Sequence, residues 1–93
     1  MKTIWKYELE IKDVQDIEIP EGAKLLHIAN QNGGLCVWFE VDQEARKKMN
    51  TFAIVGTGNA FDPKGFEHIG SVIINPFVWH VFQKTILKEL PNA

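Results

Sequence analysis

Apolar and polar residues alternate along much of this chain, as they do in a β-strand that buries one face. Residues 5–11 place aromatic and aliphatic side chains at every second position, with lysine and glutamate between them. Residues 35–41 alternate in the same way and follow Asn32-Gly33, a pair that accepts the positive φ angles of tight hairpin turns. We therefore predict a strand at 5–11 and a β-hairpin formed by residues 25–29 and 35–41.

Four further extended segments are each bounded by residues that favour turns. In chain order they cover residues 17–20, 51–55, 66–75 and 77–85. The last two are separated by Asn75-Pro76, since proline lacks the N–H that a central strand position needs. Residues 42–50 are the one segment whose sequence is also compatible with a helix, and we expect a short helical turn or a charged connection there.

Strands at short intervals, with turn residues between them, indicate a mainly β fold. We predict a small antiparallel β-sandwich or barrel of about six strands, with at most one short helix. The chain has 93 residues, which is enough for one hydrophobic core and too few for two. A single β domain is expected to cover residues 1–85, with residues 86–93 as a C-terminal tail.

Composition and charge exclude several classes of protein. With 45% hydrophobic and 24% charged residues, the chain has the composition of a folded protein rather than a disordered one. The net charge of −2 lacks the basic excess of proteins that bind nucleic-acid polymers. Charged residues near the start of the chain leave no apolar segment of the kind that a signal peptide needs, so we expect no signal peptide. No apolar run is long enough for a membrane helix, so we expect no membrane partner. The single cysteine, Cys36, fits a reducing cytoplasm.

Residues that could carry catalysis or hold a metal are sparse. The plausible metal ligands are His27, Cys36, Asp62, His68 and His80. No two of them have the close spacing of paired ligands on one turn or hairpin. Ser71, the one serine, and Cys36 lie outside the sequence contexts of known nucleophiles, so we expect both to be packing residues. The sequence therefore predicts no metal, no cofactor and no catalytic set.

Candidate ligand-binding residues lie in a glycine-rich turn and among the aromatic residues. Gly56-Thr57-Gly58-Asn59 could present backbone N–H groups to a ligand, although an ordinary tight loop explains the same residues. His80 lies among apolar neighbours, where histidine is more often a hydrogen-bonded structural residue than a base. Trp38 and Trp79 could stack on a planar ligand, and Lys64 could supply a positive charge.

The last strand is apolar on both faces. Val78 and Phe82 flank His80 on one face, while aromatic and aliphatic residues occupy the other. A domain this small has few layers with which to cover both faces. We therefore predict a homo-oligomer, most simply a symmetric dimer.

Five segments, in their order along the chain, carry a likeness to known proteins. They are Ile4-Trp5-Lys6-Tyr7-Glu8-Leu9, Pro20-Glu21-Gly22-Ala23, Gly56-Thr57-Gly58-Asn59, His68-Ile69-Gly70 and Phe77-Val78-Trp79-His80-Val81-Phe82. Together they resemble a family of small uncharacterised proteins of tailed bacteriophages and prophages, up to about Phe82. Similar proteins tend to carry histidine where this chain has Asn59. The resemblance implies a phage origin and action in the host bacterial cytoplasm, and it brings no function with it.

These observations lead to one preferred function and two alternatives. We expect a non-enzymatic accessory protein that inhibits or sequesters a host factor, for instance in countering host defence. Its ligand is either a host protein, bound through an aromatic patch or a strand edge, or a small signalling nucleotide. The alternatives are a small nucleotide-processing enzyme with His80 or His27 as base, and a structural or morphogenetic protein of the virion.

Overall fold

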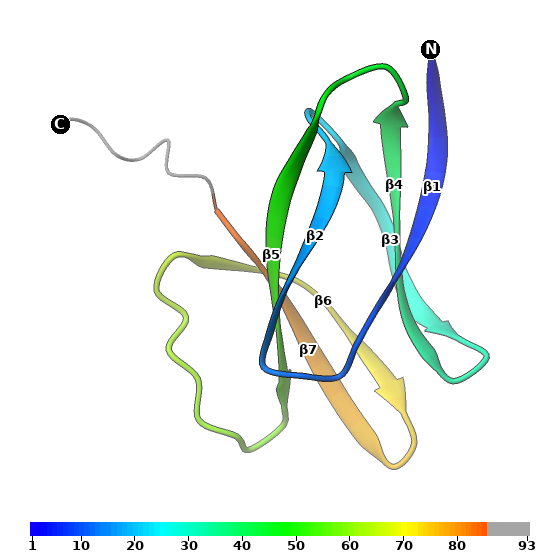
Figure 1. The fold of residues 1–93 in the computed structure, drawn as a ribbon. Coiled ribbons are helices and arrows are strands. Elements are labelled where there is room, and N and C mark those ends of the chain that lie inside the picture. Colours follow the sequence, from blue (N-terminus) through cyan, green and yellow to red (C-terminus); the bar gives the residue numbers. More distant parts are fainter. Residues whose placement is uncertain (86–93) are drawn as a thin grey trace, which may run out of the picture.

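The computed structural model describes residues 1–85, which form seven strands in two antiparallel sheets (Figure 1). The strands are β1 (Lys2–Leu9), β2 (Val14–Pro20), β3 (Lys24–Gln31), β4 (Gly34–Asp42), β5 (Lys47–Gly56), β6 (Phe66–Ile74) and β7 (Phe77–Lys84). The three-stranded sheet has the order β1-β4-β3, and the four-stranded sheet has the order β2-β5-β7-β6. This arrangement confirms the predicted mainly β, sandwich-like fold. The predicted tail, 86–93, lies outside the described residues.

Three segments differ most from the sequence prediction. β1 covers Lys2–Leu9 instead of residues 5–11, so Glu10 and Ile11 lie outside it. β2 begins at Val14, and its pairing with β5 runs from Val14 opposite Ala53 to Pro20 opposite Lys47. β5 accordingly begins at Lys47. Of the two alternatives expected for residues 42–50, the helical turn is wrong, and a charged connection is found over residues 43–46. Residues 43–46 form a turn instead, in which Asp42 Oδ1 accepts the backbone N–H of Glu44 at 3.0 Å. Among the described residues no helix occurs, and hence none that could span a membrane.

The inward side chains of both sheets form one hydrophobic core. β4 contributes every second residue, as its alternation predicts: Leu35, Val37, Phe39 and Val41. Phe52 of β5 is 0% exposed, and its ring centroid lies 6.4 Å from that of Phe39 in the other sheet. The two sheets therefore stabilise each other through the same set of buried side chains.

The sheets approach each other closely where β6 passes β3. A β-bulge between His68 and Gly70 interrupts the register of β6. A Cβ atom added at Gly70 would lie 2.5 Å from Ile28 Cγ2 of β3, a distance that real Cβ atoms do not adopt. Asn30 Nδ2 also donates to the Ile73 carbonyl at 3.1 Å. Glycine at position 70 is what allows β6 to lie this close to β3.

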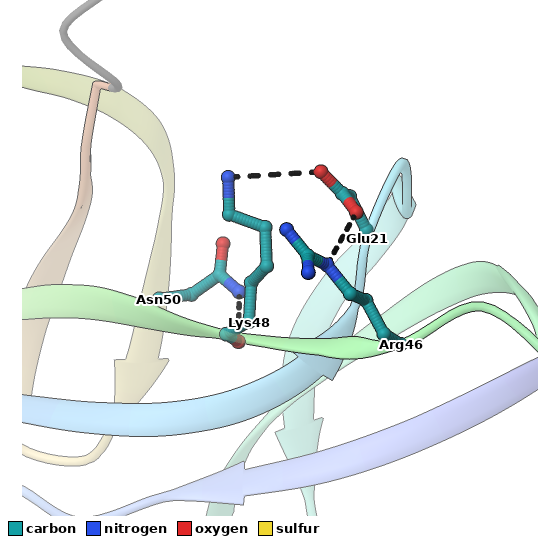
Figure 2. A network of polar contacts seen from close by, with 4 residues as sticks. All are labelled: Glu21, Arg46, Lys48 and Asn50. Carbon is teal, nitrogen blue, oxygen red and sulfur yellow. Dashed lines mark hydrogen bonds and ion pairs between the residues drawn. The ribbon is translucent and has the colours of Figure 1, made fainter.

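A polar network on the surface joins the turn after β2 to the first half of β5 (Figure 2). Glu21 Oε1 lies 3.3 Å from Arg46 Nε, and Glu21 Oε2 lies 3.9 Å from Lys48 Nζ. Asn50 Nδ2 donates to the Lys48 carbonyl at 3.0 Å, and its Oδ1 accepts from Gln83 Nε2 at 3.1 Å. The ion pairs are exposed, so each contributes at most about 1 kcal/mol to stability.

The connection between β5 and β6, residues 57–65, runs as a wide loop from the end of β5 to the edge strand β6 (Figure 1). Its Phe61 packs on the outer face of the four-stranded sheet, with ring centroids 4.6 Å from Phe82 and 5.8 Å from Phe66. The loop thus covers part of the apolar outer face of β7 within the chain itself. Ile73 and Phe77, nearer the β6–β7 turn, remain 61% and 58% exposed.

Candidate functional site

The outer face of the four-stranded sheet carries a chain of hydrogen-bonded polar side chains. His80 Nε2 lies 2.7 Å from Thr57 Oγ1, and His80 Nδ1 lies 2.8 Å from Ser71 Oγ. On its other side, Ser71 Oγ lies 3.0 Å from His68 Nε2. Both ring nitrogens of His80 are therefore paired with hydroxyl groups, and Ser71 lies between two imidazoles.

The strand register explains why these four residues meet. Ser71 of β6 pairs directly with His80 of β7, and the bulge shifts His68 so that it shares their face. His80 points outward because side chains alternate along a strand and its neighbour Val81 is 0% exposed, within the core. Thr57 reaches the same face from the start of the loop after β5.

Aromatic rings border the polar chain on the side of His68. The His68 and Phe82 ring centroids are 5.2 Å apart in an edge-on arrangement, and Phe61 stands 4.6 Å from Phe82. The two imidazoles have their centroids 6.4 Å apart. These rings restrict the orientation of His68, which keeps its Nε2 directed at Ser71.

A hollow of about 430 Å³ lies on the other side of Thr57. Its lining residues are Gly56, Thr57, Asn59, Pro76, Phe77, Val78 and Trp79. Phe77 and Trp79 form an aromatic wall, with ring centroids 5.7 Å apart. A Cβ atom at Gly56 would lie 3.0 Å from Asn59 Nδ2 and 3.1 Å from Trp79 Cζ3. The absence of a side chain at position 56 therefore makes the room in which Asn59 and Trp79 meet.

Four of the eight ligand-binding residues predicted from the sequence line this hollow. Gly56, Thr57, Asn59 and Trp79 line it, and His80 is joined to it through Thr57. Gly58 has a φ of 92°, a conformation that favours glycine, and it makes the turn between Thr57 and Asn59.

Trp38 and Lys64, also predicted as ligand-binding residues, are placed elsewhere. Trp38 lies on the outer face of the three-stranded sheet, opposite Lys6 and 5.4 Å from His27 between ring centroids. Lys64 lies in the loop, where its backbone N–H donates to Asp62 Oδ1 at 3.1 Å. Neither side chain lines the hollow.

Sequence reasoning missed the roles of Ser71 and His68. Ser71 was expected to be a packing residue, but its side chain is exposed. His68 was considered only as a metal ligand, and within residues 1–85 no group of three or more ligand-type side chains could hold a metal ion. The turn at Asn75-Pro76 was the available signal, since Ser71 lies as far before it as His80 lies after it.

Comparison with known proteins places the chain in a family. A family model for a domain of unknown function, DUF7352, matches residues 1–90. The chain belongs to this family. Neither the curated proteins nor the solved structures gave a significant match. The family description specifies no activity, so the function has to be argued from the geometry of the site.

Proposed function

We propose that this chain is a binding protein, and that it binds a partner protein at the hollow beside Thr57. The observation that carries the proposal is the meeting of four predicted ligand-binding residues in one concave surface with an exposed aromatic ring, Phe77, at its edge. Large aromatic residues beside a concave surface are typical of the sites that contribute most to protein association. Binding of this kind requires no reaction.

The lining of the hollow favours a protein segment over a signalling nucleotide as its occupant. Its lining residues are all uncharged, whereas phosphate groups are usually met by arginine, lysine or a cradle of backbone N–H groups. Lys64, the cation considered for that role, is not part of the lining. Ile73 is 61% exposed and pairs with Val78 of the lining, so it extends the apolar surface beyond the hollow, which suits an apolar partner segment.

The resemblance to proteins of tailed phages and prophages supports a proposal for where the protein acts and for the kind of partner that it binds. We propose that the partner is a host protein in the bacterial cytoplasm, and that the chain inhibits or sequesters it, as in countering host defence. A chain of 93 residues with one core is large enough to offer the roughly 800 Å² per partner that a stable protein interface buries.

A symmetric dimer is part of the same proposal. β1 lies at the edge of the three-stranded sheet, and Ile4 on this strand is 58% exposed. An antiparallel pair of β1 strands centred on Trp5 would set Lys2 of one copy opposite Glu8 of the other. Opposite charges facing each other across paired strands are stabilising, so Lys2 and Glu8 favour this pairing.

Native mass spectrometry of protein purified gently from bacterial cells tests both parts of the proposal. We expect a dimer that carries a host protein, and we expect Phe77→Ser to lose that partner while keeping its thermal unfolding midpoint. Met49→Ser is the matched control, because Met49 is 60% exposed against 58% for Phe77 and lies outside the hollow.

Each other outcome has a defined meaning. A small bound molecule in place of a protein would support the signalling-nucleotide alternative. A partner that remains bound to Phe77→Ser would contradict the hollow as the binding site, and a mass of one subunit at micromolar concentration would contradict the dimer.

A further inference from the structure

Ser71 has the surroundings of an activated nucleophile. Its Oγ lies 2.8 Å from His80 Nδ1, and a second imidazole nitrogen, His68 Nε2, lies 3.0 Å away. A nucleophilic serine needs a base within about 2.6–3.2 Å and a third group that orients this base. Thr57 Oγ1, 2.7 Å from His80 Nε2, is such a third group. Binding at the hollow makes no use of Ser71 or His68.

We infer that Ser71 is the nucleophile of an acyl-transfer site that accepts small uncharged esters. This activity goes beyond the proposed binding function. It needs Ser71 and His68, which do not line the hollow, and it shares Thr57 with the hollow. Its base is one of the two imidazoles beside Ser71.

The hydrogen bonds of the polar chain admit two proton arrangements. In one, Ser71 donates to His80 Nδ1, His80 Nε2–H donates to Thr57, and His68 Nε2–H donates to Ser71. In the other, all three hydrogen bonds reverse, and His68 Nε2 becomes the acceptor of the Ser71 proton. In both arrangements Ser71 donates to one imidazole and accepts from the other, so it always has a base and a nearby N–H donor.

The reaction that this geometry supports is ester hydrolysis through an acylated serine. Ser71 Oγ forms a bond with the ester carbonyl carbon as its proton passes to His80 Nδ1. The His68 Nε2–H, released from Oγ, donates to the carbonyl oxygen as negative charge develops there. The carbon–alkoxide bond then breaks, and the alcohol leaves with the proton from His80. Water attacks the acyl carbon in the same way, which releases the acid and restores the Ser71 hydroxyl.

The neighbours of Ser71 indicate the class of ester. Ile73, two positions further along β6, is 61% exposed and pairs with Val78 of β7. Phe82 borders the other side through its contact with His68. Both sides of the nucleophile are apolar, so a short acyl group and an apolar or aromatic alcohol fit this surface, whereas a charged ester would lose solvation without gaining a partner.

p-Nitrophenyl acetate is the probe for this inference. We expect the full-length protein to hydrolyse it and to carry an acetyl group on Ser71, found by mass spectrometry of the quenched reaction. Ser71→Ala should lower the rate at least about 100-fold, and His80→Gln should lower it by a factor of about 10²–10⁴. Thr51→Ala is the control, since its hydroxyl lies on the same sheet but is bonded to Asp16 at 2.6 Å and to no histidine.

A positioning role for Thr57 predicts a different signature. Thr57→Val removes the group that orients His80, so the pH profile of acetylation should shift while acetylation at Ser71 persists. Ser71→Cys keeps a nucleophile at the same position and should still become acetylated, which separates loss of chemistry from loss of folding. Acetylation of lysines alone, or an unchanged rate in Ser71→Ala, would overturn the inference.

The two proposals fail independently. Phe77→Ser should keep acetylation of Ser71 while losing the bound partner, and Ser71→Ala should keep the partner while losing acetylation. Loss of both properties in either variant would show that binding and acyl transfer depend on one shared site, and it would contradict two independent activities.

Discussion

The outer faces of the two sheets differ, although both follow the same alternation of inward and outward residues. On the three-stranded sheet the outer side chains form ordinary surface contacts, such as Lys6 Nζ donating to Gln31 Oε1 at 2.6 Å. On the four-stranded sheet the outer residues of β6 and β7 join in the hydrogen-bonded chain that contains Ser71 and His80. Alternation alone therefore does not determine what an outer face can do.

The connections between strands account for much of this difference. β3 and β4 are joined by a tight turn in which Asn32 and Gly33 have φ angles of 54° and 87°. This two-residue turn is too short to cover the outer face of the three-stranded sheet. The wide loop after β5 brings Thr57 and Phe61 onto the four-stranded sheet. The pairing of β6 with β7 aligns Ser71 with His80, and the loop adds Thr57, which orients His80.

The largest expected effect comes from the core that both faces share. Phe52→Ala removes a side chain that is 0% exposed, so it should lower the free energy of unfolding by about 3–5 kcal/mol. Urea unfolding can be followed by nuclear magnetic resonance, with the Trp38 indole reporting on one sheet and the His80 imidazole on the other. Both signals should change at one lowered midpoint. Separate midpoints would show that the sheets unfold independently, and they would contradict a single cooperative core.

A smaller effect is expected at the close approach of β6 to β3. Gly70→Ala places a methyl group against Ile28 Cγ2, so it should cost about 1–3 kcal/mol and displace His68 from Ser71. The His68 imidazole resonances should shift, while those of the Trp38 indole on the other sheet stay unchanged.

A double variant identifies the origin of this cost. Ile28→Ala removes the atom that the new methyl group meets, so Gly70→Ala should cost much less in that background. An equal cost in both backgrounds would assign the effect to the backbone of the bulge and would contradict the steric explanation.

Much of the fold could be predicted because hydrophobic alternation marks a strand with one buried face. Residues 35–41 are the clearest case, and the inward residues of β4 are those that the alternation selects. The first half of β5 escaped prediction because Lys47 and Met49 are exposed and carry no such pattern. β2 holds them in the sheet by backbone pairing, which side-chain hydrophobicity does not reveal.

The candidate site was predictable to a smaller extent. A two-residue turn at Asn75-Pro76 requires Ser71 to face His80, so this pair could have been found by counting. His68 could not, because the bulge after it changes the register. Thr57 depends on how β5 pairs with β7, a contact between segments far apart in the sequence.

The smallest expected effect concerns two surface polar networks, and both lie on the four-stranded sheet or in its adjoining turns. Arg46→Ala breaks the exposed ion pair with Glu21 shown in Figure 2 and should cost at most about 1 kcal/mol. That cost should shrink from low salt to about 1 M salt, where the screening length falls to about 3 Å.

Ser71→Ala removes hydrogen bonds between groups that are neutral in both proton arrangements, so its cost in unfolding free energy should not depend on salt concentration. Urea unfolding at both salt concentrations measures the two costs. Equal salt dependence would mean that an imidazole beside Ser71 carries charge, and it would favour His68 or His80 as a cation rather than as the base.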